Sequence, residues 1–115
     1  MKISTIKELL EAQTLCCEEN LGKHVYSACG CDLMSDVLAF VKDQAVLLTG
    51  LVNPQVIRTA VMMDMVCIVF VRSKVPSEEM LALAKDAGIV VMNTDKTLYN
   101  ACGLLFENGL RGSHK

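Results

Sequence analysis

The sequence predicts an α/β fold, a three-layer α/β/α sandwich around a mainly parallel central sheet of four to five strands. Three short apolar runs at residues 45–49, 66–71 and 89–92 carry this prediction. None of them alternates polar with apolar residues, a pattern typical of strands that are covered on both faces. Each run is followed by a polar break and a helical pattern. Strands and helices therefore alternate, as they do in right-handed βαβ units.

The chain begins with a pattern typical of a short helix over residues 5–12. Thr5 and Glu8 have the spacing of a capping box, in which two side chains satisfy free backbone N–H groups at the start of a helix. After this helix we expect a weak extended stretch at 14–17, a turn at 18–23 and a strand at 25–29.

The second helix is expected to begin after Asp32, whose carboxylate suits the N-cap position. Apolar residues then recur at helical spacing until the strand at 45–49 begins. The expected inward face comprises Leu33, Val37, Leu38 and Val41, with Asp36 and Lys42 outside.

The third helix is marked by Asn53 and Pro54, a capping residue followed by proline at the first helical position. This helix leads into the central strand at 66–71. Its expected apolar face is Val56, Ile57, Ala60, Val61 and Met65.

Two further helices follow the second and third apolar runs. Ser77 and the acidic residues after it start the fourth helix, and Gly88 ends it. The fifth helix ends near Gly109, so we expect one domain over residues 1–110 and a disordered tail over 111–115. The expected inward positions are Leu81, Ala84 and Ala87 in the fourth helix and Leu98, Ala101, Cys102 and Leu105 in the fifth.

The composition is unusually apolar for a chain of 115 residues. Hydrophobic residues make up 52% of it, aromatic residues only 4%, and there is no Trp. Ordinary globular domains have roughly 45–50% apolar residues. The excess has two explanations: apolar surface buried between subunits, or a sheet that is thoroughly buried within one subunit.

Charge and hydropathy exclude several classes of partner. The net charge is −2 and the pI is about 5.6, without the basic stripe that nucleic-acid binding usually needs. The N-terminus lacks the apolar region of a signal peptide, and the apolar runs fall far short of the roughly 20 residues of a membrane-spanning helix. We therefore expect a cytoplasmic protein that binds neither nucleic acid nor membranes.

The six cysteines are spaced poorly for a disulfide framework and are expected to be reduced thiols. Cys29 and Cys31 flank a single glycine and are weak candidates for a soft-metal site. The Cys-x-Cys spacing is shorter than that of metal knuckles, so we expect no metal and no cofactor. Cys31, near a helix start that lowers a thiol pKa, is also a candidate redox sensor.

Four strand-to-helix connections are expected to meet at the carboxyl edge of the sheet. The helix N-termini there favour an anion, and the backbone amides at 31–33 and 54–56 would hold it, with Arg72 as its counter-charge. For single residues such as Asp32 or Asn53, helix capping is the alternative role. The candidate ligand-binding residues are Gly30, Cys31, Asp32, Ser35, Thr49, Asn53, Arg72 and Thr94.

The common catalytic signatures are missing from the sequence. There is no Gly-x4-Gly-Lys-Ser/Thr phosphate loop, no Gly-x-Gly-x-x-Gly after a strand and no Gly-x-Ser-x-Gly elbow. We therefore expect no catalytic residues and a protein that is not an enzyme.

Residues 27–39, Ser-Ala-Cys-Gly-Cys-Asp-Leu-Met-Ser-Asp-Val-Leu-Ala, resemble the signature of the DRTGG-domain family. That family is similar to the N-terminal, non-kinase domain of HPr kinase/phosphorylase and to the middle region of long phosphotransacetylases. The Asp-Leu-Met-Ser-Asp-Val run is similar to the family's Asp-Leu-Leu-Ser-x-Val, and the resemblance extends from Lys2 to Leu110. The chain departs from the family at 27–30, where a Gly-rich stretch is expected. Further matches are Thr49 with Asn53-Pro54, and Pro76-Ser77-Glu78-Glu79 with Ala87-Gly88-Ile89.

The resemblance implies an α/β/α domain without catalytic activity that acts as a sensor or regulatory module and is often dimeric. Together with the anion-favouring sheet edge, it predicts a regulatory domain that binds a small anionic ligand, a nucleotide or a phosphorylated metabolite. The alternative is a homodimerisation or protein-interaction module without a ligand. A thiol- or metal-based sensor at Cys29 and Cys31 is the lesser alternative.

Overall fold

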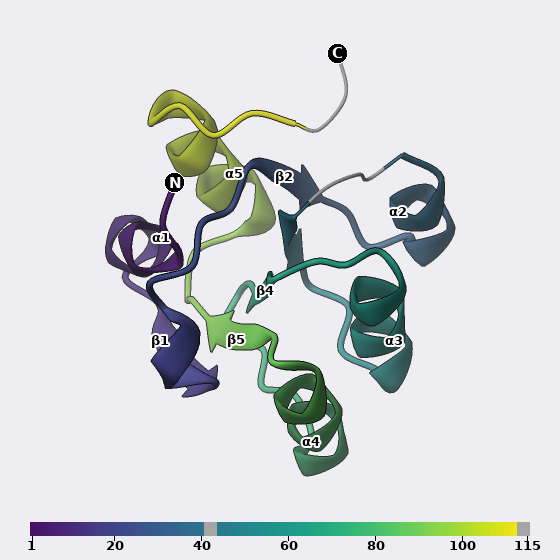
Figure 1. The fold of residues 1–115 in the computed structure, drawn as a ribbon. Helices are drawn as coiled ribbons and strands as arrows, with labels where there is room; N and C mark the ends of the chain where they lie inside the picture. Colours follow the sequence, from purple (N-terminus) through teal and green to yellow (C-terminus); the bar gives the residue numbers. More distant parts are fainter. Residues whose placement is uncertain (41–43, 113–115) are drawn as a thin grey trace.

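A five-stranded sheet lies between two layers of helices in the computed structural model, which describes residues 1–40 and 44–112 (Figure 1). The strand order is β1-β5-β4-β3-β2. Strands β2 to β5 run parallel to one another, and β1 pairs antiparallel with β5. The predicted α/β/α sandwich is confirmed. The strands are β1 (Gln13–Cys16), β2 (Ser27–Gly30), β3 (Ala45–Thr49), β4 (Cys67–Phe70) and β5 (Val90–Asn93).

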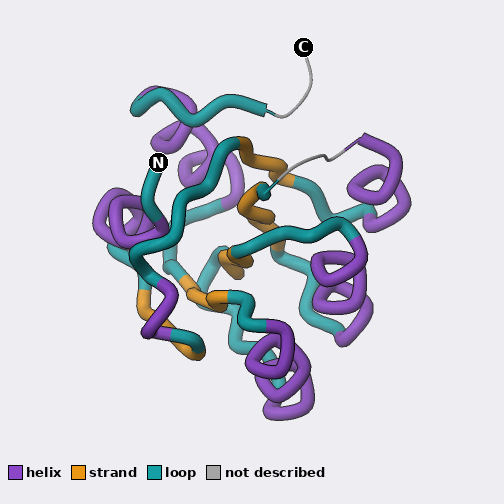
Figure 2. The backbone as a smooth tube through the Cα atoms, in the orientation of Figure 1, coloured by secondary structure: helices purple, strands orange, loops and turns teal. Residues whose placement is uncertain are grey.

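The helices divide between the two faces of the sheet (Figure 2). Helices α2, α3 and α4 connect successive neighbouring strands, and right-handed crossovers place all three on one face. Helices α1 and α5 pack on the other face, so the chain changes face after β5. The helices are α1 (Ile3–Leu10), α2 (Met34–Phe40), α3 (Pro54–Met62), α4 (Glu78–Ala87) and α5 (Leu98–Glu107), with a 3-10 turn at Glu18–Asn20.

The three apolar runs form the inner strands of the sheet, as predicted. Every residue of β3 and β4 is buried, and the side chains alternate between two apolar clusters, one under each helical layer. Such two-sided burial explains why neither strand shows a polar face in its sequence.

Several predicted helix boundaries are wrong. Helix α1 begins at Ile3, with Lys2 at the cap position and no side-chain cap, so Thr5 and Glu8 form no capping box at its start. Helix α2 begins at Met34, which places Leu33 rather than Asp32 at the position before it.

The predicted inward faces also need correction. In α2, Met34 and Val37 are buried, whereas Leu33 and Leu38 are exposed; Val41 and Lys42 lie outside the described residues. In α3 and α4 the positions predicted inward but found exposed are Val61 and Ala87. The buried residues that the prediction missed are Thr59 and Met80.

Part of the expected C-terminal tail lies against the sheet. The amide of Ala28 donates to the Arg111 carbonyl at 3.0 Å, and Gly112 forms a bridge with Ala28. The Arg111 guanidinium stacks 3.9 Å from the centre of the Phe106 ring. Residues 111 and 112 therefore continue the packed structure beyond α5.

In the part of the chain that the structure describes, no helix combines the length and the hydrophobicity needed to cross a bilayer.

Candidate functional site

The loops after the four parallel strands lie side by side at the carboxyl edge of the sheet. Backbone hydrogen bonds continue the ladder beyond the strands: Cys31 N donates to Leu48 O at 3.0 Å, and Val71 N donates to Thr49 O at 3.1 Å. Between the loops that follow β4 and β5, Arg72 N donates to Lys96 O at 2.8 Å. The sheet thus brings the four predicted loops together.

Asp32 joins the loop after β2 to the loop after β3. Its Oδ1 accepts hydrogen bonds from Thr49 Oγ1 and from Gly50 N, both at 2.8 Å. Thr49 Oγ1 in turn accepts from Leu51 N at 3.1 Å. These bonds use Asp32 Oδ1 and the Thr49 hydroxyl within the protein, and the carboxylate places a negative charge at this end of the edge.

Asn53 caps α3, as its alternative role predicts. Its Oδ1 accepts from Gln55 N at 2.9 Å, and its backbone carbonyl accepts from Val56 N at 3.1 Å. Pro54 has no N–H to donate. The amides of Gln55 and Val56, which were predicted to hold an anion, are thus used to cap the helix.

The amides of Cys31 and Leu33 are also engaged. Cys31 N belongs to the extended ladder, and Leu33 N donates to Cys31 Sγ at 3.3 Å. The same thiol donates to the Leu33 carbonyl at 3.4 Å. Ser35 is exposed on the first turn of α2.

Thr94 is buried and holds two structural hydrogen bonds. Its Oγ1 donates to the Leu10 carbonyl at 2.7 Å and accepts from Lys96 N at 3.3 Å. The first bond satisfies a carbonyl in the last turn of α1, which has no partner within its own helix. The Thr94 hydroxyl is thus used within the protein, where it is buried beneath the sheet edge.

Arg72 and Ser73 form a strained turn directly after β4. Both residues have left-handed backbone conformations, with φ values of 57° and 58°, and Lys74 N donates to Val71 O at 3.2 Å. Two successive positive φ values with this bond define a type I′ turn, which favours Asn and Gly. Each non-glycine residue in this conformation costs about 1–2 kcal/mol.

Contacts with the neighbouring loop hold that turn in place. Ser73 N donates to Thr94 O at 2.8 Å, and Asn93 Nδ2 donates to Lys74 O at 3.2 Å. The side chains of Arg72 and Lys74 are exposed. The turn therefore presents two cations at the carboxyl end of the middle strand of the sheet. Sequence reasoning found Arg72 but missed the turn, because neither Gly nor Asn marks it.

Gly30 is required by packing against α5. A Cβ at this position would overlap the Cys102 sulfur atom. This close approach explains the glycine without any ligand.

Two free thiols near β2, Cys29 and Cys102, have raised pKa values. Burial raises the pKa of Cys29 to about 11, and the neighbouring Cys31 and Cys102 thiols add to this effect. Burial also raises the pKa of Cys102. Within residues 1–40 and 44–112, no group of three or more His, Cys, Asp or Glu side chains is arranged to hold a metal ion. Raised pKa values oppose the thiolate form that metal binding and oxidation require.

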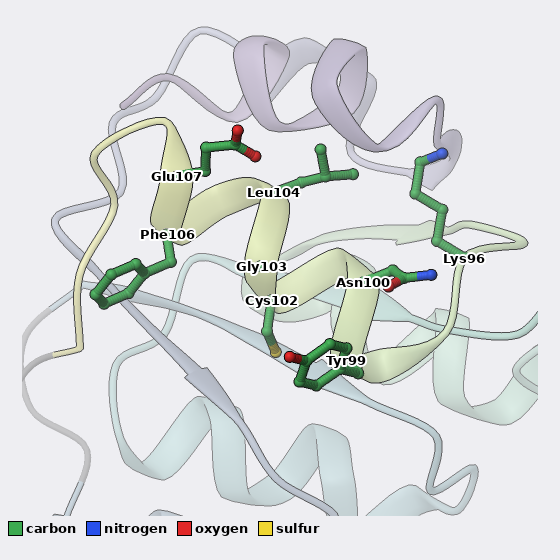
Figure 3. A pocket seen from close by; sticks show the side chains of 8 residues that line it. All are labelled: Lys96, Tyr99, Asn100, Cys102, Gly103, Leu104, Phe106 and Glu107. Carbon is green, nitrogen blue, oxygen red and sulfur yellow. The ribbon is translucent and has the colours of Figure 1, made fainter.

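A separate hollow of about 720 Å³ lies on the outward side of α5 (Figure 3). None of the predicted ligand-binding residues lines it. Tyr99, Cys102 and Phe106 project along one side of the helix, and Leu104 and Glu107 project along the other. The full lining is Lys96, Tyr99, Asn100, Cys102, Gly103, Leu104, Phe106 and Glu107.

No protein-family model and no curated protein sequence matches the chain. Among solved structures, the chain is similar to the crystal structure of the CBS and DRTGG domains of the regulatory region of Clostridium perfringens pyrophosphatase, complexed with the activator diadenosine tetraphosphate. The TM-score is 0.73 and the sequence identity is 18%. The match covers 90% of this chain and 45% of that chain. This likeness shows the fold alone, and the chain spans less than half of that structure's length.

Proposed function

We propose that this chain is a non-catalytic regulatory domain, and that it binds a small anionic ligand of the nucleotide class at the carboxyl edge of its sheet. The observation that carries this proposal is the strained Arg72-Ser73 turn at the end of β4. Backbone strain of this kind concentrates at ligand sites, where the surrounding structure maintains it. The activator of the similar pyrophosphatase region, diadenosine tetraphosphate, supports the choice of ligand class.

The position of the turn also favours ligand binding. Ligands of open α/β sheets bind outside the carboxyl ends of the strands, where neighbouring connections leave toward opposite faces. Here β4 leads to α4 on one face and β5 leads to α5 on the other (Figure 1). Arg72 follows the first of these two strands and is hydrogen-bonded to the loop that follows the second.

The charges at the carboxyl edge of the sheet favour an anion at the end of β4. Asp32 is a carboxylate between the β2 and β3 loops, and its charge repels a phosphate there. Arg72 and Lys74 are the cations at the β4 loop, and an arginine fork suits phosphate oxygens. We therefore place the phosphates over residues 72–74 rather than over the start of α2.

Titration calorimetry with ATP and with diadenosine tetraphosphate tests the proposal. The informative variant is Arg72→Asn, because asparagine tolerates the left-handed conformation and removes the charge. Losing a charge-assisted hydrogen bond of roughly 1.5–3 kcal/mol weakens binding about 10- to 150-fold. Thermal shifts of the two proteins at saturating nucleotide give an independent measure.

Arg58→Gln is the matched control, because Arg58 is an exposed arginine in the middle of α3. We expect this variant to bind as the wild type does. No saturable binding of either nucleotide by the wild type, or equal binding by the Arg72→Asn variant, contradicts the proposal.

A further inference from the structure

We propose that the outward face of α5 is a docking surface for a second copy of this chain, with Gly103 of each copy at the crossing point. This inference is independent of the ligand proposed above. It rests on an unexplained glycine, on the hollow that the glycine leaves, and on the charges at the two ends of that hollow.

Gly103 lies in the interior of α5, where glycine is the least favourable residue apart from proline. A Cβ at this position would meet no atom within 4 Å in the described part of the chain. Gly30 differs, because a Cβ there would overlap the Cys102 sulfur. Nothing within the described subunit therefore requires a glycine at 103, whereas close approach by another backbone would.

The side chains around Gly103 form a socket rather than a flat surface. Tyr99, Asn100, Phe106 and Glu107 precede or follow it by three or four residues, so they surround it on the helix surface. All four line the 720 Å³ hollow (Figure 3). Four such neighbours around a position without a side chain leave room for the backbone of a facing helix to approach closely.

The two aromatic side chains of the socket are unusually exposed. Tyr99 is 87% and Phe106 is 58% exposed. The Arg111 guanidinium stacks against the Phe106 ring. Aromatic side chains supply much of the binding energy at the centres of protein interfaces. Covering them would also account for part of the apolar excess in the composition.

The charges at the ends of the hollow favour a second copy as the occupant. Lys96 lies just before α5 and Glu107 is its last residue, and both line the hollow. When two α5 helices cross antiparallel about a two-fold axis, Lys96 of each copy lies near Glu107 of the other. The surface is thus complementary to itself, as an isologous dimer requires. Lys96 also pairs with Glu11 of its own subunit at 3.2 Å, which orients its ammonium group.

Sedimentation equilibrium of the wild type and two Gly103 variants tests this inference. We expect the wild type to dimerise and Gly103→Leu to weaken dimerisation at least about tenfold, because a leucine fills the socket. Gly103→Ala should act in two directions. It should weaken dimerisation and raise the thermal stability of the dilute monomer, since alanine favours the helix and meets no clash. Because the alanine variant is expected to fold well, its weaker dimerisation is not explained by misfolding.

Control variants separate this surface from other apolar surfaces. Ala82→Leu places a leucine at an exposed position of α4, and Met62→Lys changes the exposed apolar surface between α3 and α4. Both should dimerise as the wild type does. Glu107→Lys should weaken dimerisation, and adding Lys96→Glu should restore it.

A wild type that stays monomeric at high concentration overturns the inference. So does dissociation by Met62→Lys without dissociation by Gly103→Leu, because the dimer would then use the α3–α4 surface. Dimerisation that is equal in all variants overturns it as well. Nucleotide binding is measured in a separate calorimetry experiment. Failure of the ligand proposal therefore leaves the sedimentation result on dimerisation unaffected.

Discussion

The Thr94 hydroxyl donates a 2.7 Å hydrogen bond to the carbonyl of Leu10, 84 residues earlier in the chain. This bond fastens the last turn of α1 to the loop after β5. It is buried, so removing the hydroxyl leaves a carbonyl that water does not readily reach. The bond identifies Thr94 as a residue that holds two elements together at the sheet edge.

Replacing Thr94 with valine should therefore lower stability and leave nucleotide affinity unchanged. We expect the free energy of unfolding to fall by about 1–3 kcal/mol, the cost of a buried unpaired acceptor. Urea denaturation measures this change. Thr97→Val is the comparison variant, because Thr97 is an exposed threonine at the N-cap of α5, whereas Thr94 is buried. A Thr94→Val protein of full stability that fails to bind nucleotide would restore Thr94 as a ligand-binding residue.

The fold could be predicted from the sequence because its inner strands are continuous apolar runs. The runs at 45–49, 66–71 and 89–92 match β3, β4 and β5 to within one residue at each end. The antiparallel pairing of β1 could not be predicted. That strand has only four residues, and its register with β5 is irregular between Thr14 and Cys16.

The candidate site was harder to predict, because its geometry depends on contacts between distant residues. Capping by Asn53 is local and could be anticipated from the Asn-Pro pair. The Asp32 bonds to the β3 loop depend on strand pairing, and the Thr94 bond depends on the packing of α1. The left-handed turn at Arg72 has no sequence signal, because tertiary hydrogen bonds maintain it.

The contact between Gly30 and Cys102 predicts a compensating pair of substitutions. Gly30→Ala alone should destabilise the protein by about 1–3 kcal/mol, because the new methyl group overlaps the Cys102 sulfur. Cys102→Ala removes the sulfur atom, so the double variant should recover most of that loss. Thermal denaturation of the two single variants and the double variant gives the coupling energy. Strictly additive effects would show that the two positions are not in contact.

Burial of Cys29 predicts a loss of stability at alkaline pH. Its pKa is raised from 9.0 to about 11 in the folded chain, so unfolding releases a proton between those values. The unfolded state is then favoured as pH rises, and stability that is present below pH 9 declines toward pH 11. Cys17, whose pKa burial also raises to about 11, adds to the decline.

Urea denaturation at a series of pH values under reducing conditions checks this dependence. We expect Cys29→Ala to flatten the decline relative to the wild type, because one of the titrating thiols is gone. A slope that Cys29→Ala leaves unchanged would mean that the thiol titrates alike in the folded and unfolded chains.

The strain at the Arg72-Ser73 turn predicts a substitution that stabilises the protein. Ser73→Gly should raise the free energy of unfolding by about 1 kcal/mol, because glycine adopts the left-handed conformation without a Cβ clash. The Ser73 amide bond to the Thr94 carbonyl does not involve the side chain and is kept. Nucleotide binding should persist in this variant, because Arg72 and Lys74 are both retained. Equilibrium unfolding and calorimetry on the same preparation measure the two effects.

Gly22→Ala provides a contrast, since Gly22 is a surface glycine without the positive φ that would penalise alanine. If Ser73→Gly instead lowers stability, then the serine side chain contributes more to the turn than its backbone strain costs.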